Sequence, residues 1–303
     1  MSAGAPRERP VKVIYVMGAG HSGSTILGVA LGNCAAMFFA GELEEFLARA
    51  GVPVLGGLER TRFWAQVRER VPQASELYGH DAHSLLERSS ALLRVHRRAA
   101  ARALRPRYRA LAAALFRAVA QVAGADYVID TSHFPLRARE LQRTPGIELY
   151  VILLVREPQP VIASMTRLIS QHDVARRRLM TLRANAELWL TYALSLAVFR
   201  RQPPERRILV RYEDLVAEPE RVLAQILARF GSDAPLPDLD ALQTGRAIQA
   251  NRLISSEQVA FKRAPHTREQ ARGGSPLTAV LQRPWRAAFA RLRPTASREA
   301  RGR

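Results

Sequence analysis

The stretch VKVIYVMGAGHSGSTILGVAL, residues 11–31, is the most informative part of this sequence. Its first part, Val11–Met17, is apolar and rich in β-branched residues, which is typical of a strand buried on both faces. A glycine-rich turn follows at residues 18–25, and Thr25–Leu31 then has the pattern of a helix. A strand, a glycine-rich turn and a helix in this order direct backbone N–H groups at an anion. We therefore predict an anion-binding loop here.

The rest of the chain predicts an α/β fold, a parallel β-sheet flanked by helices. Three further runs have the apolar character of buried strands: Tyr127–Asp130, Glu148–Arg156 and Ile208–Tyr212. The stretches with helical character are Thr25–Leu31, Leu85–Leu104, Tyr108–Val122, Pro160–Ile169, Ala175–Phe199 and Pro219–Phe230, with an interruption at Pro106. Strands that alternate with helices favour a parallel, doubly wound sheet.

Composition narrows the class of protein. The chain has 303 residues, 48% of them apolar, and a formal charge of +19, so it is globular and attracts anions. All basic residues except Lys12 and Lys262 are arginine, which also fits a compositional bias. The single cysteine, Cys34, excludes a disulfide framework and cysteine-based metal sites. With no export signal or membrane span in the sequence, we expect a cytoplasmic location.

The glycine-rich turn has the spacing of a Walker A loop, with one change. Gly18 is followed after four residues by Gly23, Ser24 and Thr25, so Ser24 stands where that loop has its lysine. The missing lysine argues against ATP or GTP hydrolysis, because its charge holds the β- and γ-phosphates. The alternative is a tight turn whose small residues serve packing only.

A second anion site is indicated where the strand Glu148–Arg156 ends. Arg156 is followed by Glu157-Pro158, and Ser164 comes eight residues after the arginine. An arginine fork and a serine hydroxyl at the carboxyl end of a strand suit a phosphate monoester. The alternative is an ordinary surface arginine and a serine in a helix interior.

Together these motifs resemble those of sulfotransferases that use 3′-phosphoadenosine-5′-phosphosulfate (PAPS). GHSGSTIL, residues 20–27, resembles the family's 5′-phosphosulfate loop, with His21 at its basic position. The Arg156 and Ser164 pair is similar to the 3′-phosphate motif. Tyr-Glu-Asp-Leu at 212–215 resembles the segment whose tyrosine approaches the adenine, and Asn251-Arg252 is similar to a later Gly-Asn-Arg element, with Ala250 replacing the glycine. For Tyr212 the alternative is a core aromatic residue on a strand.

The resemblance extends to a bacterial branch of that family. Its further marks are a Gly-Glu pair, a Phe-Trp pair and an Asp-Ser-Ser-Lys motif, matched here by Gly41-Glu42, Phe63-Trp64 and Asp130–His133. The branch's Pro and Arg after the last motif are present as Pro135 and Arg137. His133 replaces the family's lysine, and the cysteines usual around the Phe-Trp pair are missing.

The resemblance implies a P-loop-like sulfotransferase fold that moves the sulfuryl group of PAPS in line to a hydroxyl or amine of an acceptor, without a metal. The acceptor is a small molecule or a glycan, and no specific nucleic-acid partner is expected. The residues that it implies for PAPS binding are Gly20, His21, Ser22, Gly23, Ser24, Thr25, Arg156, Ser164, Tyr212, Asn251 and Arg252.

Three catalytic candidates follow from the same resemblance. Glu42 is the first choice of general base, with a solvated acidic helix start in GELEEFLARA as its alternative. His133 is the rival base, and its position favours a hydrogen bond to the transferred group instead. His21 would stabilise the leaving oxygen.

One domain over 11–283 is expected, with a helical insertion at about 60–122 on the substrate side and a basic tail at 284–303. Between Arg88 and Arg109 lie eight arginines and no acid, which form either a basic lid or a solvated helix face. Three other functions stay open: a sulfotransferase-like protein with impaired catalysis, a degenerate nucleotide kinase, and a basic protein that binds polyanions.

Overall fold

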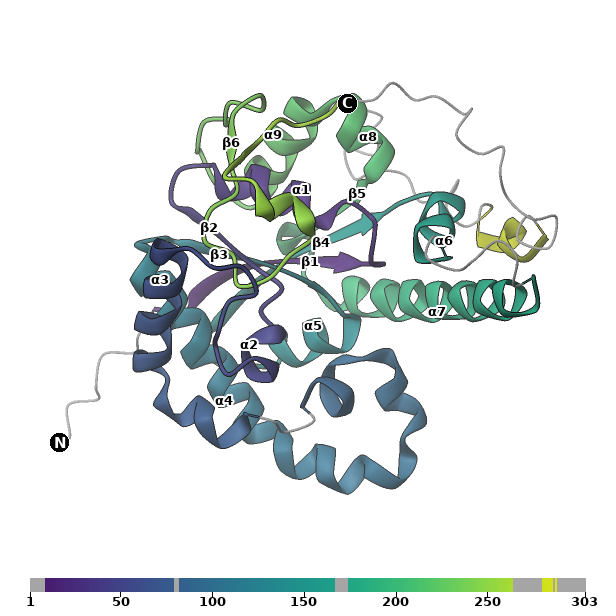
Figure 1. Ribbon diagram of the computed structural model, residues 1–303, viewed down its shortest axis with the longest axis horizontal. Helices are drawn as coiled ribbons and strands as arrows, with labels where there is room; N and C mark the ends of the chain where they lie inside the picture. The colour runs from purple at the N-terminus through teal and green to yellow at the C-terminus, as the bar shows by residue number, and fades with distance from the viewer. Residues whose placement is uncertain (1–8, 79–81, 167–173, 264–279, 286, 288–303) are drawn as a thin grey trace.

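A computed structural model describes residues 9–78, 82–166, 174–263, 280–285 and 287. Its centre is a sheet of five parallel strands in the order β2-β3-β1-β4-β5 (Figure 1). The strands are β1 (Val11–Gly18), β2 (Met37–Gly41), β3 (Tyr127–His133), β4 (Ile147–Val155) and β5 (Arg207–Arg211), and a separate antiparallel pair comprises β6 (Leu242–Gln243) and β7 (Gln258–Val259). The α/β prediction is confirmed.

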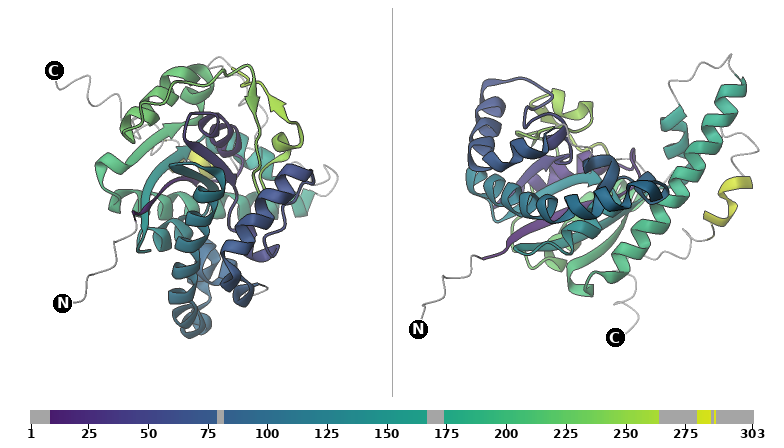
Figure 2. Two further views of the ribbon diagram at one scale, coloured as in Figure 1. Left: turned by 90° about the vertical axis from the view of Figure 1, so that its left-hand side faces the viewer. Right: turned by 90° about the horizontal axis from the view of Figure 1, so that it is seen from below.

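Helices cover both faces of this sheet in Figures 1 and 2. The α-helices are α1 (Ser24–Gly32), α2 (Glu45–Ala48), α3 (Leu58–Arg70), α4 (Arg98–Ala123), α5 (Pro135–Leu141), α6 (Pro158–Thr166), α7 (Val174–Arg201), α8 (Tyr212–Ala217) and α9 (Pro219–Arg229). Short 3-10 or π turns are η1 (Pro72–Leu77), η2 (His83–Glu87), η3 (Ser89–Leu93), η4 (Val95–Arg97), η5 (Pro204–Arg206) and η6 (Arg252–Ser255). No helix among the described residues is long and apolar enough to cross a membrane.

Alternate side chains of β1 supply two separate cores. Val13, Tyr15 and Met17 pack with residues of α3, α4, α5 and α7 on one face. Ile14 and Val16 pack with residues of α1, α8 and α9 on the other. Because successive side chains of a strand point to opposite faces, a strand between two helical layers must be apolar throughout. This explains the continuous apolar run at Val11–Met17.

All five strands are parallel, so their carboxyl ends lie along one edge of the sheet. The chain leaves β1 through α1 towards β2, and it leaves β4 through α6 and α7 towards β5, on the opposite side of β1. The neighbouring strands β1 and β4 therefore flank the point where the winding reverses, where α/β sheets bind ligands.

Three expectations need correction. Strand β2 was not predicted, because Met-Phe-Phe-Ala-Gly is short and has no β-branched residue. Helix α4 continues through Pro106, where a break was expected; Pro106 and Arg102 are both exposed, so solvent can satisfy the carbonyl that the proline leaves without a donor. Tyr212 begins helix α8 and is not on a strand.

Part of the expected C-terminal tail is described. Residues 280–285 are helical, and Trp285 is buried against Trp189 and Tyr192 of α7. Residues 286 and 288–303 lie outside the described residues.

Candidate active site

The glycine-rich loop joins β1 to α1 as the sequence predicted. Gly23 caps α1 with φ of 91°, and a Cβ atom there would lie 2.5 Å from the ring of Tyr212. The position therefore needs glycine for its backbone angle and for space. Ser22, Ser24 and Thr25 are buried at the start of the helix. The loop thus presents the amino end of α1 and three hydroxyl groups to one place.

Ser22 is a buried polar residue of this loop whose hydroxyl could bind an anionic ligand. Its side chain is 1% exposed, and its Oγ has no hydrogen-bond partner of ordinary geometry among the described residues. The nearby Tyr192 hydroxyl interacts with it only weakly. A buried hydroxyl that is poorly hydrogen-bonded is costly, and an anionic oxygen in the loop would satisfy it.

Arg156 reaches from the end of β4 to the loop that follows the neighbouring strand β1. It is the first residue after β4, and its Nη1 donates to the His21 carbonyl oxygen at 2.8 Å. Its guanidinium lies 4.1 Å from the centre of the Tyr212 ring, which itself covers Gly23. The loop after β1, the end of β4 and the start of α8 thus meet as a donor-side cluster, defined as His21, Ser22, Gly23, Arg156 and Tyr212.

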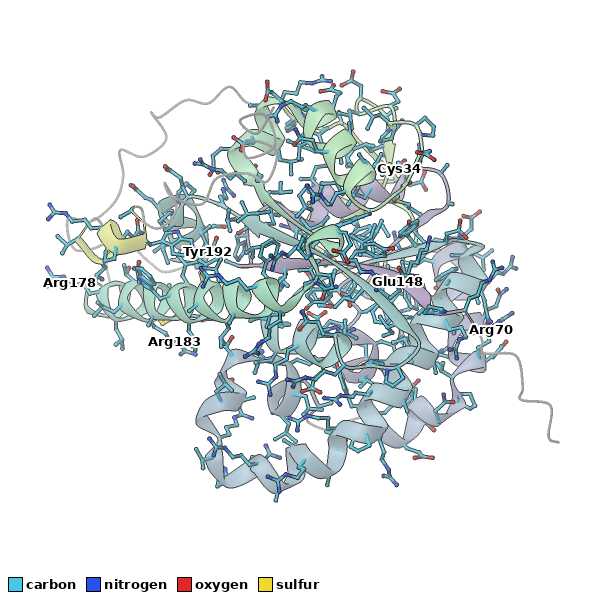
Figure 3. The ribbon with its side chains drawn as sticks, turned by 180° about the vertical axis from the view of Figure 1, so that it is seen from behind. Cys34, Arg70, Glu148, Arg178, Arg183 and Tyr192 are labelled. Atoms are coloured by element: carbon cyan, nitrogen blue, oxygen red, sulfur yellow. The ribbon has the colours of Figure 1, made fainter. Side chains whose placement is uncertain are left out.

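Tyr192 supports the backbone of Arg156 from below. Its hydroxyl accepts from the Arg156 N–H at 3.2 Å and donates to the Arg156 carbonyl at 3.4 Å. Figure 3 shows the residue on the side of α7 that faces the sheet, and the Trp285 ring stacks on it with centroids 4.1 Å apart. Burial raises the pKa of Tyr192 to about 12, against smaller lowering by the Arg156 backbone and the Ser22 hydroxyl. The phenol is therefore a neutral structural group.

A second cluster forms where β2 and β3 end. Glu42 follows Gly41 at the end of β2, and its backbone N–H donates to the Gln249 carbonyl at 2.8 Å. A Cβ atom on Gly41 would lie 2.1 Å from that same oxygen, so the close approach requires glycine. The Gln249 side chain also donates from Nε2 to Glu42 Oε2 at 3.3 Å.

The end of β3 holds the other side of the Glu42 segment. Asp130 Oδ1 accepts from the backbone N–H of Leu43 at 3.4 Å and from that of Ser132 at 2.9 Å. Ser132 Oγ accepts from the N–H of Glu44 at 3.3 Å and donates to Asp130. We define the acceptor-side cluster as Glu42, Asp130, Ser132, His133 and Gln249.

A buried ionic network lies behind Asp130. Arg137 donates from Nε at 3.1 Å and from Nη2 at 3.0 Å, both to the same oxygen, Asp130 Oδ2. Its Nη1 donates to Glu87 at 2.6 Å and to the Tyr108 hydroxyl at 2.8 Å. Since Glu87 ends η2 and Tyr108 lies on α4, this arginine ties the helical region at about 60–122 to the end of β3.

Burial dominates the electrostatics of the two glutamates in this segment. It raises the pKa of Glu42, helped by Glu45 and Asp130 and opposed by the Gln249 hydrogen bond. It raises the pKa of Glu44 well above its usual value, helped by Asp130 and Glu42. Glu44 Oε2 is buried without a hydrogen-bond partner among the described residues. The alternative interpretation of Glu42 as part of a solvated acidic face therefore does not fit, since Glu44 is buried.

The two histidines at usually basic positions share a backbone feature. His21 has φ of 63° and His133 has φ of 55°, in the left-handed region that non-glycine residues rarely enter. A Cβ atom on Gly20 would lie 4.0 Å from His133 Nε2, so that imidazole borders the glycine-rich loop. His133 of the acceptor-side cluster thus borders the donor side, and strained residues of this kind gather at functional sites.

Among the residues that the structure describes, no hydrogen bond or ion pair joins Ser164, Asn251 or Arg252 to the two clusters. Ser164 is half-buried on α6, the helix that begins two residues after Arg156. Asn251 and Arg252 are exposed at the start of η6, shortly after Gln249. Of the arginines between 88 and 109, Arg105 and Arg109 pair with the buried Glu140 at 3.0 and 2.6 Å. That region is partly structural. In the described ranges, no three His, Cys, Asp or Glu residues gather as metal ligands would.

Sequence patterns missed three residues of the site. Gln249 approaches Glu42 across 207 residues of sequence, and Tyr192 approaches Arg156 across 36. Glu44 is buried although it lies in an acidic stretch with Glu42 and Glu45. The requirement for glycine at position 41 was the one available signal, because a glycine after a strand often marks a close backbone approach.

Comparison with known proteins identifies the family. The profile described as "Sulfotransferase family" matches residues 13–236. The chain belongs to the sulfotransferase family. No curated protein matches this sulfotransferase. The match covers every strand of the parallel sheet, the glycine-rich loop and both clusters except Gln249.

Two solved structures share the fold of this sulfotransferase. The sulfotransferase domain from the curacin biosynthetic pathway is 19% identical with a TM-score of 0.55, covering 90% of this chain and 97% of that domain. The sulfotransferase domain from the Synechococcus PCC 7002 olefin synthase is also 19% identical, with a TM-score of 0.56 and coverage of 93% and 96%. These structures support the P-loop-like sulfotransferase fold. The family match supports a sulfotransferase activity.

Proposed function

We propose that this sulfotransferase uses PAPS as its donor and transfers the sulfuryl group in line to a hydroxyl or amine of a small-molecule or glycan acceptor. One observation carries the proposal: Arg156 spans from the end of β4 to the His21 carbonyl, beside a loop that holds the buried hydroxyl of Ser22. Two neighbouring anion-binding elements suit a donor that carries both a 5′-phosphosulfate and a 3′-phosphate.

The donor-side residues would divide the nucleotide between them. Residues Gly20–Thr25 and the amino end of α1 offer N–H and hydroxyl donors to the phosphosulfate. Arg156, together with Ser164 on the following helix, suits the 3′-phosphate, as do Asn251 and Arg252 from η6. Tyr212 offers its ring for the base.

The acceptor-side residues would manage charge and the acceptor proton. Glu42, held on both sides by Gln249 and the end of β3, accepts the proton of the attacking group. His133, beside Gly20, donates a hydrogen bond to the transferred group, and His21 does so to the leaving oxygen. The protein's contribution is positioning and charge stabilisation, as in phosphoryl transfer.

The decisive experiment is calorimetric titration with 3′-phosphoadenosine-5′-phosphate (PAP), AMP and Mg-ATP. We expect PAP to bind most tightly and the preference for PAP over AMP to fall in Arg156→Ala. Arg183→Ala is the matched control, because Arg183 is an exposed arginine on α7 (Figure 3). Equal affinity for PAP and AMP would refute the donor assignment, and preference for Mg-ATP would favour the kinase alternative. Equally weak binding of all three, with steep salt dependence, would favour polyanion binding.

A further inference from the structure

Gln249 links Glu42 to a series of polar side chains beside the edge strand β2. Its Nε2 donates to Glu42 Oε2 at 3.3 Å, and its Oε1 accepts from Arg49 Nε at 3.0 Å. Arg49 Nε also donates to Glu45 Oε2 at 3.1 Å. The series therefore runs from Glu45 through Arg49 and Gln249 to Glu42.

Arg49 determines which way the Gln249 amide faces. A guanidinium has only donors, so the amide oxygen must be the atom turned towards it. The NH2 group then faces the Glu42 carboxylate, which has only acceptors when ionised. Arg49 and Glu42 therefore require the same orientation of the Gln249 amide. In that orientation the amide donates one hydrogen bond, to Glu42 Oε2. Among the described residues no hydrogen bond or ion pair reaches Glu42 Oε1, so the lone pairs of that oxygen are left for an acceptor proton.

The backbone around Gln249 makes the contact rigid. The segment 247–249 docks on the edge strand β2: Ile248 N–H donates to the Ala40 carbonyl at 3.0 Å, and Gly41 pairs with Gln249 as an isolated parallel bridge. Glu42 N–H then donates to the Gln249 carbonyl at 2.8 Å. Main chain and side chain of one residue thus hold both ends of Glu42.

The charges around Glu42 show what the amide does there. Three carboxylates lie near it, Glu44, Glu45 and Asp130, and Arg49 and Arg137 lie behind Gln249 and Asp130. Burial and the carboxylates raise the pKa of Glu42, and the Gln249 hydrogen bond lowers it. A hydrogen bond donated to the charged form of an acid favours that form.

We propose that Gln249, oriented by Arg49, is a positioning residue that keeps the Glu42 carboxylate ionised and presents its Oε1 to the acceptor. This rests on the proposed role of Glu42 as general base. Gln249 touches Glu42 and not the reacting atoms, so it acts through that carboxylate alone.

The test is a direct titration of Glu42 by carbon NMR of the full chain with labelled glutamate, with the Glu42→Gln variant to assign the signal. In Gln249→Leu we expect the pKa of Glu42 to rise by about half a unit or more, because a charge-stabilising hydrogen bond is lost. In Arg49→Leu, which keeps the amide but frees its orientation, we expect a smaller rise. Gln243→Leu is the matched control, an exposed glutamine six residues away, and should leave the titration unchanged.

The outcomes separate the proposal from the function beneath it. An unchanged or lower pKa of Glu42 in both Gln249→Leu and Arg49→Leu would overturn the role of Gln249. If Gln249→Leu fails to fold, Arg49→Leu decides alone, since Arg49 is largely exposed. The titration needs neither donor nor acceptor. A failure of PAP binding, or full activity in Glu42→Gln, would therefore refute the proposed function while the titration still reported on Gln249.

Discussion

The donor-side and acceptor-side clusters lie on the same edge of one sheet but are built differently. The donor side consists of a short continuous loop, one arginine and one tyrosine, and its arginine binds a backbone carbonyl. The acceptor side rests on a buried ionic network in which Arg137 serves both Asp130 and Glu87. The first depends mainly on backbone groups and a helix terminus, whereas the second depends on charged side chains that are buried.

The two clusters should therefore respond differently to substitution. Loop amides and a helix terminus bind an anion with little dependence on distant residues. A buried charge, in contrast, is stable only while every partner is present, because its desolvation is repaid by those partners. Changes on the donor side should therefore alter ligand affinity, and changes on the acceptor side should alter stability and pH dependence.

Replacing the proposed base gives the largest expected effect. Glu42→Gln should lower the rate of sulfuryl transfer from PAPS to an aliphatic alcohol, whose proton must be removed on attack, by about 10²–10⁴-fold, the range for losing a general base. PAP affinity should not change. Because burial raises the pKa of Glu42, the wild-type rate should fall on the acid side at a higher pH than for an ordinary glutamate, and this limb should vanish in the variant. A limb that persists in Glu42→Gln and disappears in His133→Asn would assign the base to His133.

Breaking the ionic network comes next. Arg137→Leu should reduce the free energy of unfolding by about 3–5 kcal/mol, since it leaves Asp130 and Glu87 buried without their cation. Urea denaturation measures this. Arg263→Ala, which removes an exposed ion pair with Glu220, is the control and should change little. Equal midpoints for the two variants would show that the network contributes no more than a surface pair.

The contact between Gly23 and Tyr212 tests the donor side. Gly23→Ala should weaken PAP binding by about tenfold to a hundredfold, because the new methyl group meets the Tyr212 ring and the backbone angle becomes strained. The loss should be partly restored in Gly23→Ala with Tyr212→Ala, relative to Tyr212→Ala alone. Calorimetry of the four proteins gives the cycle. Additive losses would mean that strain alone acts and that the ring contact is unimportant.

The smallest expected effect is a change in how the free energy of unfolding depends on pH. The pKa of Glu44 is raised in the folded state above the 4.5 of a free side chain, so its contribution to stability is greatest below that pH and declines as pH rises. Glu44→Gln lacks this decline. The stability of the variant relative to wild type should thus increase with pH above 4.5, by up to about 1.4 kcal/mol per unit. Urea melts at several pH values measure it, with exposed Glu59→Gln as the reference; parallel slopes would contradict a buried, protonated Glu44.

The fold and half of the site could be predicted because their signals are local. Four strands were apparent from apolar runs, and the loop from its glycines and hydroxyls, since these patterns act within one strand-turn-helix unit. Strand β2 escaped because its five residues favour neither structure strongly, and α4 passed through Pro106 because an exposed proline can be tolerated there. Trp285 was expected in the basic tail, yet it stacks on Tyr192, a contact that no local pattern encodes.

The sequence alone was enough to predict the parallel α/β architecture, the anion-binding loop, Arg156 at the end of a strand, and Glu42 and His133 as candidate site residues. The partners of those groups are known only from the tertiary structure: Tyr192 bonds to Arg156, Arg137 to Asp130, and Gln249 to Glu42. The physical reason is range. Backbone geometry and apolar periodicity are set by neighbours in the chain, whereas desolvation and the partners of a charge depend on segments that only folding brings together.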